Sequence, residues 1–174
     1  MTYANRGQTL EKMIELSNNQ YASRGIATVQ KIPTPVKVLS NKGGRVSGFY
    51  EKKSTVDYIG VWKGRGVAFD AKETKVTTRF DLKNIHDHQY RYMKNWQENG
   101  GISFLIVMFS TLDEIYYLSF GELEYWVEED DRKSIPYESF EHRIQGGNVV
   151  VDYLKVIEEV QYGINTTTDR GDDE

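Results

Sequence analysis

Three charged residues, Asp57, Asp70 and Lys72, have types and a spacing suited to phosphodiester chemistry assisted by a divalent metal. Side chains alternate along a strand, so Asp70 and Lys72 of the run VAFDAK project to the same face. Asp57 is expected on a preceding strand that pairs antiparallel with this one, which brings the two carboxylates together. Two carboxylates beside a lysine suit magnesium, for which manganese can substitute. The metal acidifies a bound water, and the lysine orients that water or stabilises the developing negative charge.

The placement of these residues matters as much as their spacing. An Asp followed 13 positions later by Asp-x-Lys also arises by chance, often as a surface salt bridge across a hairpin that contributes little. Here both acids are predicted on adjacent strands, after one helix and before another, which is the core order of restriction-type nucleases. Val56 stands where those nucleases have a proline before the first acid, and that proline is not needed for the chemistry.

The segment before the acids is expected to form a helix, a strand and a hairpin. Residues 8–23 carry apolar side chains at helical spacing. Residues 27–32 favour a strand, which ends at two prolines because proline removes a ladder donor. Residues 36–53 contain Asn-Lys-Gly-Gly between two extended runs, which predicts a projecting hairpin with a basic tip. Its polar composition places it outside the core.

The remaining segments complete one α/β domain. Strands 55–62 and 67–72 are joined by a glycine-containing turn, and the apolar run 102–109 is typical of a buried central strand. Further predicted elements are a helix at 86–99, a strand at 115–118, and helices at 122–127 and 153–160. These elements indicate one α/β domain around a mixed central sheet flanked by helices. The resemblance to restriction-type nucleases implies a restriction-endonuclease-like core, from which the hairpin projects as a stalk. We assign 1–162 to a single nuclease domain and 163–174 to an acidic flexible tail.

Composition and charge narrow the class of protein. The 174-residue chain has a net charge of −4, but residues 1–109 hold 17 Lys and Arg against 9 Asp and Glu. That basic segment can bind phosphates despite the acidic total, although a solvated surface explains the charge equally well. There is no cysteine, which excludes disulfides and thiolate zinc sites and fits a reducing cytoplasm. No segment is apolar enough for a signal peptide or a membrane span, so a soluble cytoplasmic protein is expected.

Motifs of competing enzyme classes are absent from the sequence. It has no Walker A run, no HExxH and no Gly-x-Ser-x-Gly. The turn Lys63-Gly64-Arg65-Gly66 is not a phosphate loop, because a strand follows it rather than a helix. His86 and His88 lack a third zinc ligand at suitable spacing, so capping of the following helix or DNA contact is expected instead.

Several separate blocks of the sequence resemble the RecU family of Holliday-junction resolvases, which belongs to the PD-(D/E)xK nucleases. They occur in the family's order and cover most of residues 5–135. The blocks are Asn5-Arg6-Gly7 with Leu10-Glu11, KIPTPV (31–36), KSTVDYIG (53–60), FDAKET (69–74), RFDLKNIHDHQ (79–89) and RKSI (132–135). The resemblance implies a homodimer that cuts four-way DNA junctions symmetrically with magnesium, and that associates with a RecA-type recombinase.

The resemblance also implies a role for each residue at a matching position. Thr55, Asp57, Asp70 and Gln89 match metal-site positions, and Lys72 matches the lysine that stabilises the transition state. At the position of Asp70 the family commonly has glutamate, which is one methylene longer. The segment 36–53 corresponds to the family's stalk, which enters the junction centre, and it is rather short here.

For several other polar and aromatic residues, a functional role and a structural role are both consistent with the sequence. The cations expected to contact DNA phosphates are Lys42, Arg45, Lys52 and Lys53 on the hairpin, and Arg6 near the chain start. The alternative for the hairpin is a solubilising role. Glu11 either reaches the active site as a catalytic or metal-binding acid, or is simply solvated. Tyr90, Tyr92 and Trp96 are expected in the core or an interface rather than stacked on bases.

Three functions remain open from the sequence. The first is a structure-selective resolvase that acts as a dimer on four-way junctions. The second is a sequence-specific restriction-type DNA endonuclease with the same core. The third is a DNA-binding relative without catalysis, against which the intact set of Asp57, Asp70 and Lys72 argues.

Overall fold

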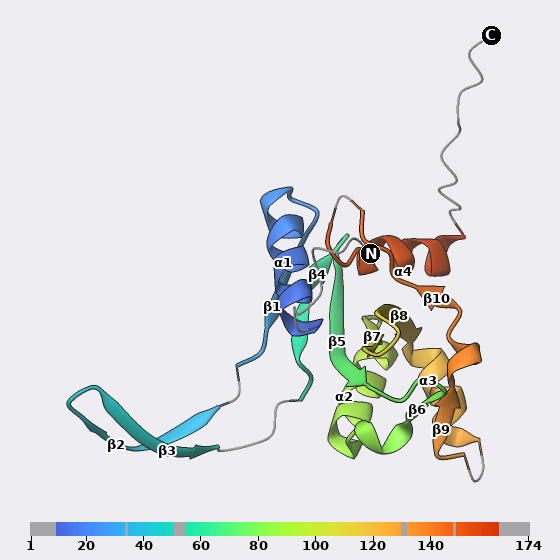
Figure 1. The fold of residues 1–174 in the computed structure, drawn as a ribbon. Helices are drawn as coiled ribbons and strands as arrows, with labels where there is room; N and C mark the ends of the chain where they lie inside the picture. The colour runs from blue at the N-terminus through green and yellow to red at the C-terminus, as the bar shows by residue number, and fades with distance from the viewer. Residues whose placement is uncertain (1–9, 34, 51–54, 130–131, 148, 164–174) are drawn as a thin grey trace.

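A six-stranded sheet forms the centre of the protein (Figure 1). The computed structural model describes residues 10–33, 35–50, 55–129, 132–147 and 149–163. In spatial order the strands are β1 (Ala27–Lys31), β4 (Tyr58–Trp62), β5 (Arg65–Thr74), β7 (Ile102–Phe109), β8 (Glu114–Ser119) and β10 (His142–Arg143). β5 and β7 pair in parallel and the other neighbours pair antiparallel. The predicted mixed sheet of an α/β fold is therefore confirmed.

Helices cover both faces of this sheet. The helices α1 (Leu10–Ser23) and α4 (Tyr153–Tyr162) pack on one face, and α2 (Asp87–Glu98) and α3 (Phe120–Glu128) contribute to the core on the other. The alternation of β5 divides its side chains between the two cores. Phe69 belongs to the α1 and α4 side, while Ala68 belongs to the α2 side. β7 is buried along its whole length, as its apolar run predicts.

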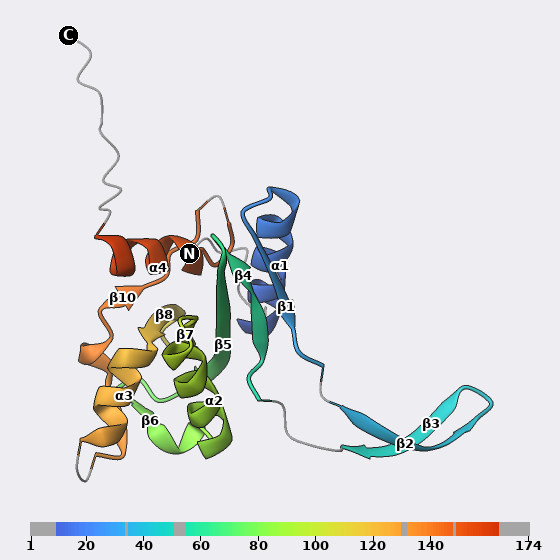
Figure 2. The same cartoon turned by 180° about the vertical axis from the view of Figure 1, so that it is seen from behind.

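The predicted hairpin projects away from the sheet in both views (Figures 1 and 2). It consists of β2 (Val36–Lys42) and β3 (Arg45–Tyr50), paired antiparallel. Gly43 and Gly44 form its two-residue turn with φ angles of 57° and 79°, which glycine adopts without steric cost. Every residue of β2 is exposed, and the two hydrophobic cores contain no residue of either strand. The last predicted hairpin residues, 51–53, lie outside the described residues.

One predicted strand boundary is wrong in a way that affects the site. The strand expected from Thr55 begins at Tyr58, so Asp57 lies one residue before β4 rather than within it. The pairing with β5 starts at Tyr58 and Phe69. Beyond that pair the backbone N–H of Asp57 donates to the side chain of Asp70, at 2.9 Å, instead of to a backbone carbonyl. The β4–β5 pairing ends there because the Asp57 N–H bonds the Asp70 carboxylate and not a backbone carbonyl of β5.

Short elements were not predicted at all. They are the ladder of β6 (Arg79–Asp81) with β9 (Ser134–Pro136), the strand β10, and the 3-10 turns η2 (Leu82–Asn84) and η3 (Tyr137–Ser139). None is long enough to show a hydrophobic period in the sequence. At the C-terminal end, Gly163 terminates α4 with a φ of 63°, and residues 164–174 of the predicted tail lie outside the described residues. No helix in the described part of the chain is long and apolar enough to cross a membrane.

Candidate active site

The two predicted acids hold each other in place through the backbone. The Asp57 N–H donates to Asp70 Oδ1 at 2.9 Å, and the Ala71 N–H donates to Asp57 Oδ2 at 3.1 Å. The carbonyl of Asp57 accepts from the N–H of Ile32 at 2.8 Å, which ties it to the end of β1. Asp57 is thus fixed between two strands although it lies outside the ladder. The predicted approach of Asp57 to Asp70 is present.

Asp70 is fully buried on the α2 side of β5. Burial is the largest cause that raises the pKa of its carboxyl, to about 7, and the charge of Asp57 adds to it. The ammonium of Lys72 opposes this by lowering the same pKa. A carboxylate in such a place is costly without a cation, because charges are poorly solvated in the protein interior.

Lys72 and Gln89 complete the surroundings of Asp70. Lys72 Nζ lies 2.5 Å from Asp70 Oδ2 and donates to Gln89 Oε1 at 3.1 Å. Gln89 Nε2 donates to Asp70 Oδ2 at 2.7 Å. Gln89 is also the third residue of α2, where its Oε1 accepts the backbone N–H of His86 at 3.1 Å. The start of α2 therefore positions this amide beside the acids, as the resemblance implied.

The donor set fits a hard divalent cation. Two carboxylates and one amide oxygen are the ligand types that magnesium uses, and it completes its coordination with water and substrate phosphate. With both acids ionised, Asp57, Asp70 and Lys72 carry a net charge of −1, and within the described part of the chain Asp57 makes no ion pair. Gln89 Oε1 is engaged by two donors and Nε2 faces Asp70. Its amide would have to turn to present oxygen to a metal.

Two other predicted site residues make no hydrogen bond or ion pair with Asp57, Asp70, Lys72 or Gln89 among the described residues. Thr55 is exposed, and its side chain makes no hydrogen bond with a described residue. Glu11, on α1, pairs with Lys31 at 2.7 Å, and this hydrogen bond is the largest cause that raises the pKa of Lys31. Glu11 also lines a hollow with Ala71 and Glu73, whose side chains lie on the opposite face of β5 from Asp70. The structure therefore does not bring Glu11 into contact with the acids.

Two of the five predicted DNA-contact residues lie on the described part of the hairpin. Lys42 and Arg45 flank the Gly43–Gly44 turn and are exposed, which gives the basic tip that the sequence indicated. Lys52, Lys53 and Arg6 lie outside the described residues.

The histidine pair lies beside the site without forming a metal centre. His86 is the N-cap residue of α2, as expected. Its ring stacks on that of His88, with centroids 5.5 Å apart and planes 11° from parallel. In the part of the chain that the structure describes, no three His, Cys, Asp or Glu residues group as a metal site.

Most of the chain matches one known protein family. A family model described as "RecU: Recombination protein U" matches residues 5–159, which is most of the chain. The chain belongs to the RecU family. It is 41% identical over 175 residues to the Holliday junction resolvase RecU of Geobacillus thermodenitrificans, covering 93% of this chain and 87% of that protein. The Staphylococcus carnosus protein of the same name is also 41% identical, over 160 residues, with 87% and 76% covered.

One solved structure is also similar in outline. It is Hjc of Archaeoglobus fulgidus, a Holliday junction resolvase from an archaeal hyperthermophile. The alignment has a TM-score of 0.43 and 7% sequence identity, and it covers 75% of this chain and 85% of that one.

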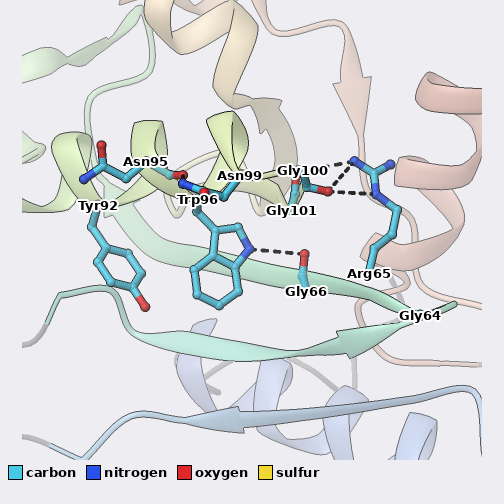
Figure 3. Close-up of a pocket in the computed structure, with 9 residues that line it drawn as sticks. All are labelled: Gly64, Arg65, Gly66, Tyr92, Asn95, Trp96, Asn99, Gly100 and Gly101. Atoms are coloured by element: carbon cyan, nitrogen blue, oxygen red, sulfur yellow. Dashed lines mark hydrogen bonds between the residues drawn. The ribbon is translucent and has the colours of Figure 1, made fainter.

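A second hollow, which was not predicted from the sequence, lies at the other end of β5. Its volume is about 610 Å³, and it lies between the β4–β5 turn and the C-terminal half of α2 (Figure 3). None of the acids, nor Lys72 or Gln89, lines it. In the sequence, Gly64 and Gly66 predict only the turn between the two strands, and no local pattern indicates a hollow beside it.

Proposed function

We propose that the protein is a magnesium-dependent endonuclease that resolves Holliday junctions by paired, symmetric cleavage, as part of DNA recombination and repair in the cytoplasm. The observation that carries the proposal is the contact of Asp57, Asp70 and Lys72 at one end of the paired strands β4 and β5. Membership of the RecU family supports the choice of substrate, because the matched relatives are named Holliday junction resolvases.

In this proposal Asp57 and Asp70 hold the metal, with Gln89 and Thr55 as further ligands. A bound magnesium ion would supply Lewis-acid activation of water and neutralise charge on the phosphate. The burial of Asp70 and its hydrogen bond from the Asp57 N–H fix one carboxylate before any metal arrives. That preorganisation saves the cost of ordering the ligands when the substrate binds.

The ammonium of Lys72 can contact either protein groups or the substrate phosphate. In the structure its ammonium neutralises Asp70 and bonds Gln89 Oε1. With Asp70 engaged as a metal ligand, the ammonium of Lys72 would be available to contact the phosphate. There it stabilises the negative charge that develops on the oxygens as the bond to the leaving group breaks.

The projecting hairpin supports both junction binding and a homodimer. Its tip carries Lys42 and Arg45, which suit phosphate contacts in the centre of a junction. Its strands expose large apolar side chains, with Leu39 at 67% and Phe49 at 50%. Apolar side chains of this number on a projecting hairpin favour a protein partner. A two-fold dimer also supplies the two matched sites that symmetric nicking requires. A RecA-type recombinase is a further proposed partner.

The alternative is a sequence-specific restriction-type endonuclease with the same catalytic group. A mobile four-way junction and a linear duplex of equal sequence separate the two functions. The proposal expects rapid cutting of the junction at symmetric positions, in magnesium and not in chelator, with manganese as a substitute. Cutting of the duplex at one defined site, as fast as the junction, would favour the alternative instead.

The role of Asp57 can be tested without disturbing the fold. In Asp57→Asn the amide oxygen still accepts the Ala71 N–H, so the local geometry is retained while the charge is lost. We expect cleavage to fall at least about 100-fold, since a ligand of the metal is lost, and junction binding in chelator to stay within a factor of about two to three.

Glu73→Gln is the matched control for Asp57→Asn. It removes one negative charge from β5, at an exposed position on the opposite face. Cleavage by this control should stay at the wild-type rate. Wild-type cleavage by Asp57→Asn would remove Asp57 from the mechanism.

A further inference from the structure

The second hollow has a lining that is aromatic and amide-rich and contains no acidic side chain (Figure 3). Its residues come from the β4–β5 turn and from the C-terminal half of α2 with the glycines that follow it. They are Gly64, Arg65, Gly66, Tyr92, Asn95, Trp96, Asn99, Gly100 and Gly101. A hollow lined by one cation, two aromatic rings and two amides suits a planar, polar group attached to an anion.

The indole of Trp96 is fixed as one wall of this hollow. Its Nε1 donates to the carbonyl of Gly66 at 3.1 Å (Figure 3). A Cβ atom on Gly66 would lie 2.9 Å from Trp96 Cζ2, and one on Gly101 would lie 2.3 Å from Nε1. Both positions therefore leave no space for a side chain while the indole is in place. The wall is preformed and does not need a ligand to order it.

The neighbouring groups are available for a ligand. Tyr92 and Trp96 are partly buried and pack against the core on the α2 side, as the sequence predicts, and their rings lie 5.7 Å apart at an angle of 32°. Among the described residues, the side chains of Tyr92 and Asn95 have no hydrogen-bond partner, although both border the hollow. Arg65 bonds the carbonyl of Gly100 and the side chain of Gln161, which fixes its positive charge at the rim. The side chains of Tyr92, Asn95 and Arg65 supply hydrogen-bond donors and acceptors of the kind that bind base edges.

The hollow and the acids are joined by two rigid elements. Trp96 follows Gln89 by seven residues on α2, which is about 10 Å at the rise of a helix. Gly66 precedes Asp70 by four residues on β5, which is about 13 Å at the rise of a strand. One DNA strand advances about 3.4 Å per stacked nucleotide. A strand cut at the acids and running along these two elements would reach the hollow about three to four nucleotides away.

We propose that this hollow binds an unstacked base of the junction strand that is being cut. The inference rests on the proposed function, because it concerns the same substrate. The base stacks on the rings of Tyr92 and Trp96, and Asn95 bonds its edge. Aromatic stacking accepts every base, so the hollow selects strands that can release a base rather than a sequence. Strand crossings in a junction meet that condition more easily than an intact duplex does.

Photo-crosslinking tests the proposal directly. A four-way junction carries 5-iodouracil at single positions two to six nucleotides from the cleaved bond, and it is bound in chelator. We expect crosslinks to the peptide that contains Tyr92 and Trp96, concentrated at three to four nucleotides. The corresponding linear duplex should give none. Crosslinks elsewhere on the protein, with binding intact, would overturn the proposal.

Variants give a second readout. Tyr92→Ala should weaken junction binding about 5- to 150-fold, the range for loss of one stacked base, and Asn95→Ala should weaken it less. Tyr125→Ala is the matched control, since Tyr125 is 58% exposed on α3 and its ring contacts Trp126. That variant should bind like the wild type. Equal affinities for Tyr92→Ala and the wild type, with both proteins folded in urea titrations, would refute the role of the ring.

Three further outcomes can be told apart. If Tyr92→Ala converts a dimer into monomers in sedimentation, the hollow is a contact between copies of the chain and the proposal is overturned. If the wild-type protein cuts junctions but its crosslinks avoid the hollow, only this inference fails. If the wild-type protein neither binds nor cuts a junction, the proposed function fails and this inference fails with it.

Discussion

Asp70 combines complete burial with a negative charge, and its surroundings explain how the fold tolerates this. Its two oxygens receive the Asp57 N–H, the amide of Gln89 and the ammonium of Lys72. Each contact offsets part of the lost hydration. Burial still dominates and holds the pKa of Asp70 at about 7, so the carboxyl binds a proton in the folded protein at pH values where an unfolded chain does not.

This raised pKa predicts how stability depends on pH in metal-free protein. The folded state binds more protons than the unfolded state between about pH 4 and pH 7. The contribution of Asp70 is therefore complete below pH 4, falls as the pH rises through this window, and is constant above it. The expected slope is up to about 1.4 kcal/mol per pH unit.

Urea unfolding in chelator, repeated across this range, measures the slope. Asp70→Asn should remove the contribution of this residue, whereas Glu98→Gln, at the exposed end of α2, should leave it in place. The same slope in Asp70→Asn and wild type would assign the effect to another group.

At the scale of elements, the periodicity of the sequence predicted the long, regular strands and helices. The alternation of β5 correctly placed Asp70 and Lys72 on one face, and the apolar run of β7 identified the central strand. The start of β4 was missed because the carboxylate of Asp70 accepts the Asp57 N–H, a tertiary contact without a local signature. The hollow at Trp96 was missed for the same reason, since its walls are 30 residues apart in the chain.

Gly60 shows how closely β1 and β4 must approach. A Cβ atom at this position would lie 2.2 Å from the carbonyl oxygen of Thr28 and 2.7 Å from the Cα of Val29. Gly60→Ala should therefore push β1 away and lower the free energy of unfolding by roughly 1–3 kcal/mol. Because Ile32 at the end of β1 bonds the carbonyl of Asp57, cleavage should fall as well.

Gly121→Ala provides the comparison for Gly60→Ala. Gly121 lies in the first turn of α3, and an added Cβ would meet nothing within 4 Å. Alanine favours a helix, so the free energy of unfolding should rise by about 0.5–1 kcal/mol. If urea titrations gave both variants equal stability, the close contact of β1 with β4 would not be what constrains residue 60.

For the whole molecule, the hairpin stands apart from the residues that stabilise the fold. Neither hydrophobic core includes a residue of β2 or β3, and the hairpin extends away from the helices and the sheet (Figure 2). Its changes should therefore affect partners more than stability. The basic excess of residues 1–109 includes its tip, while residues 110–174 hold 5 Lys and Arg against 17 Asp and Glu. Phosphate contacts are accordingly expected at the hairpin and not across the whole surface.

The salt dependence of junction binding tests this distribution. Lys42→Gln with Arg45→Gln removes two exposed cations beside the turn. If both contact phosphates, the slope of log affinity against log salt should become shallower by about 1.8, since each contact contributes about 0.9 on B-form DNA. Lys12→Gln with Lys155→Gln removes the same charge from exposed positions on α1 and α4. If the two double variants reduced the slope equally, net charge rather than the hairpin would account for binding. If Lys42→Gln with Arg45→Gln left the slope unchanged, the hairpin tip would not contact junction phosphates.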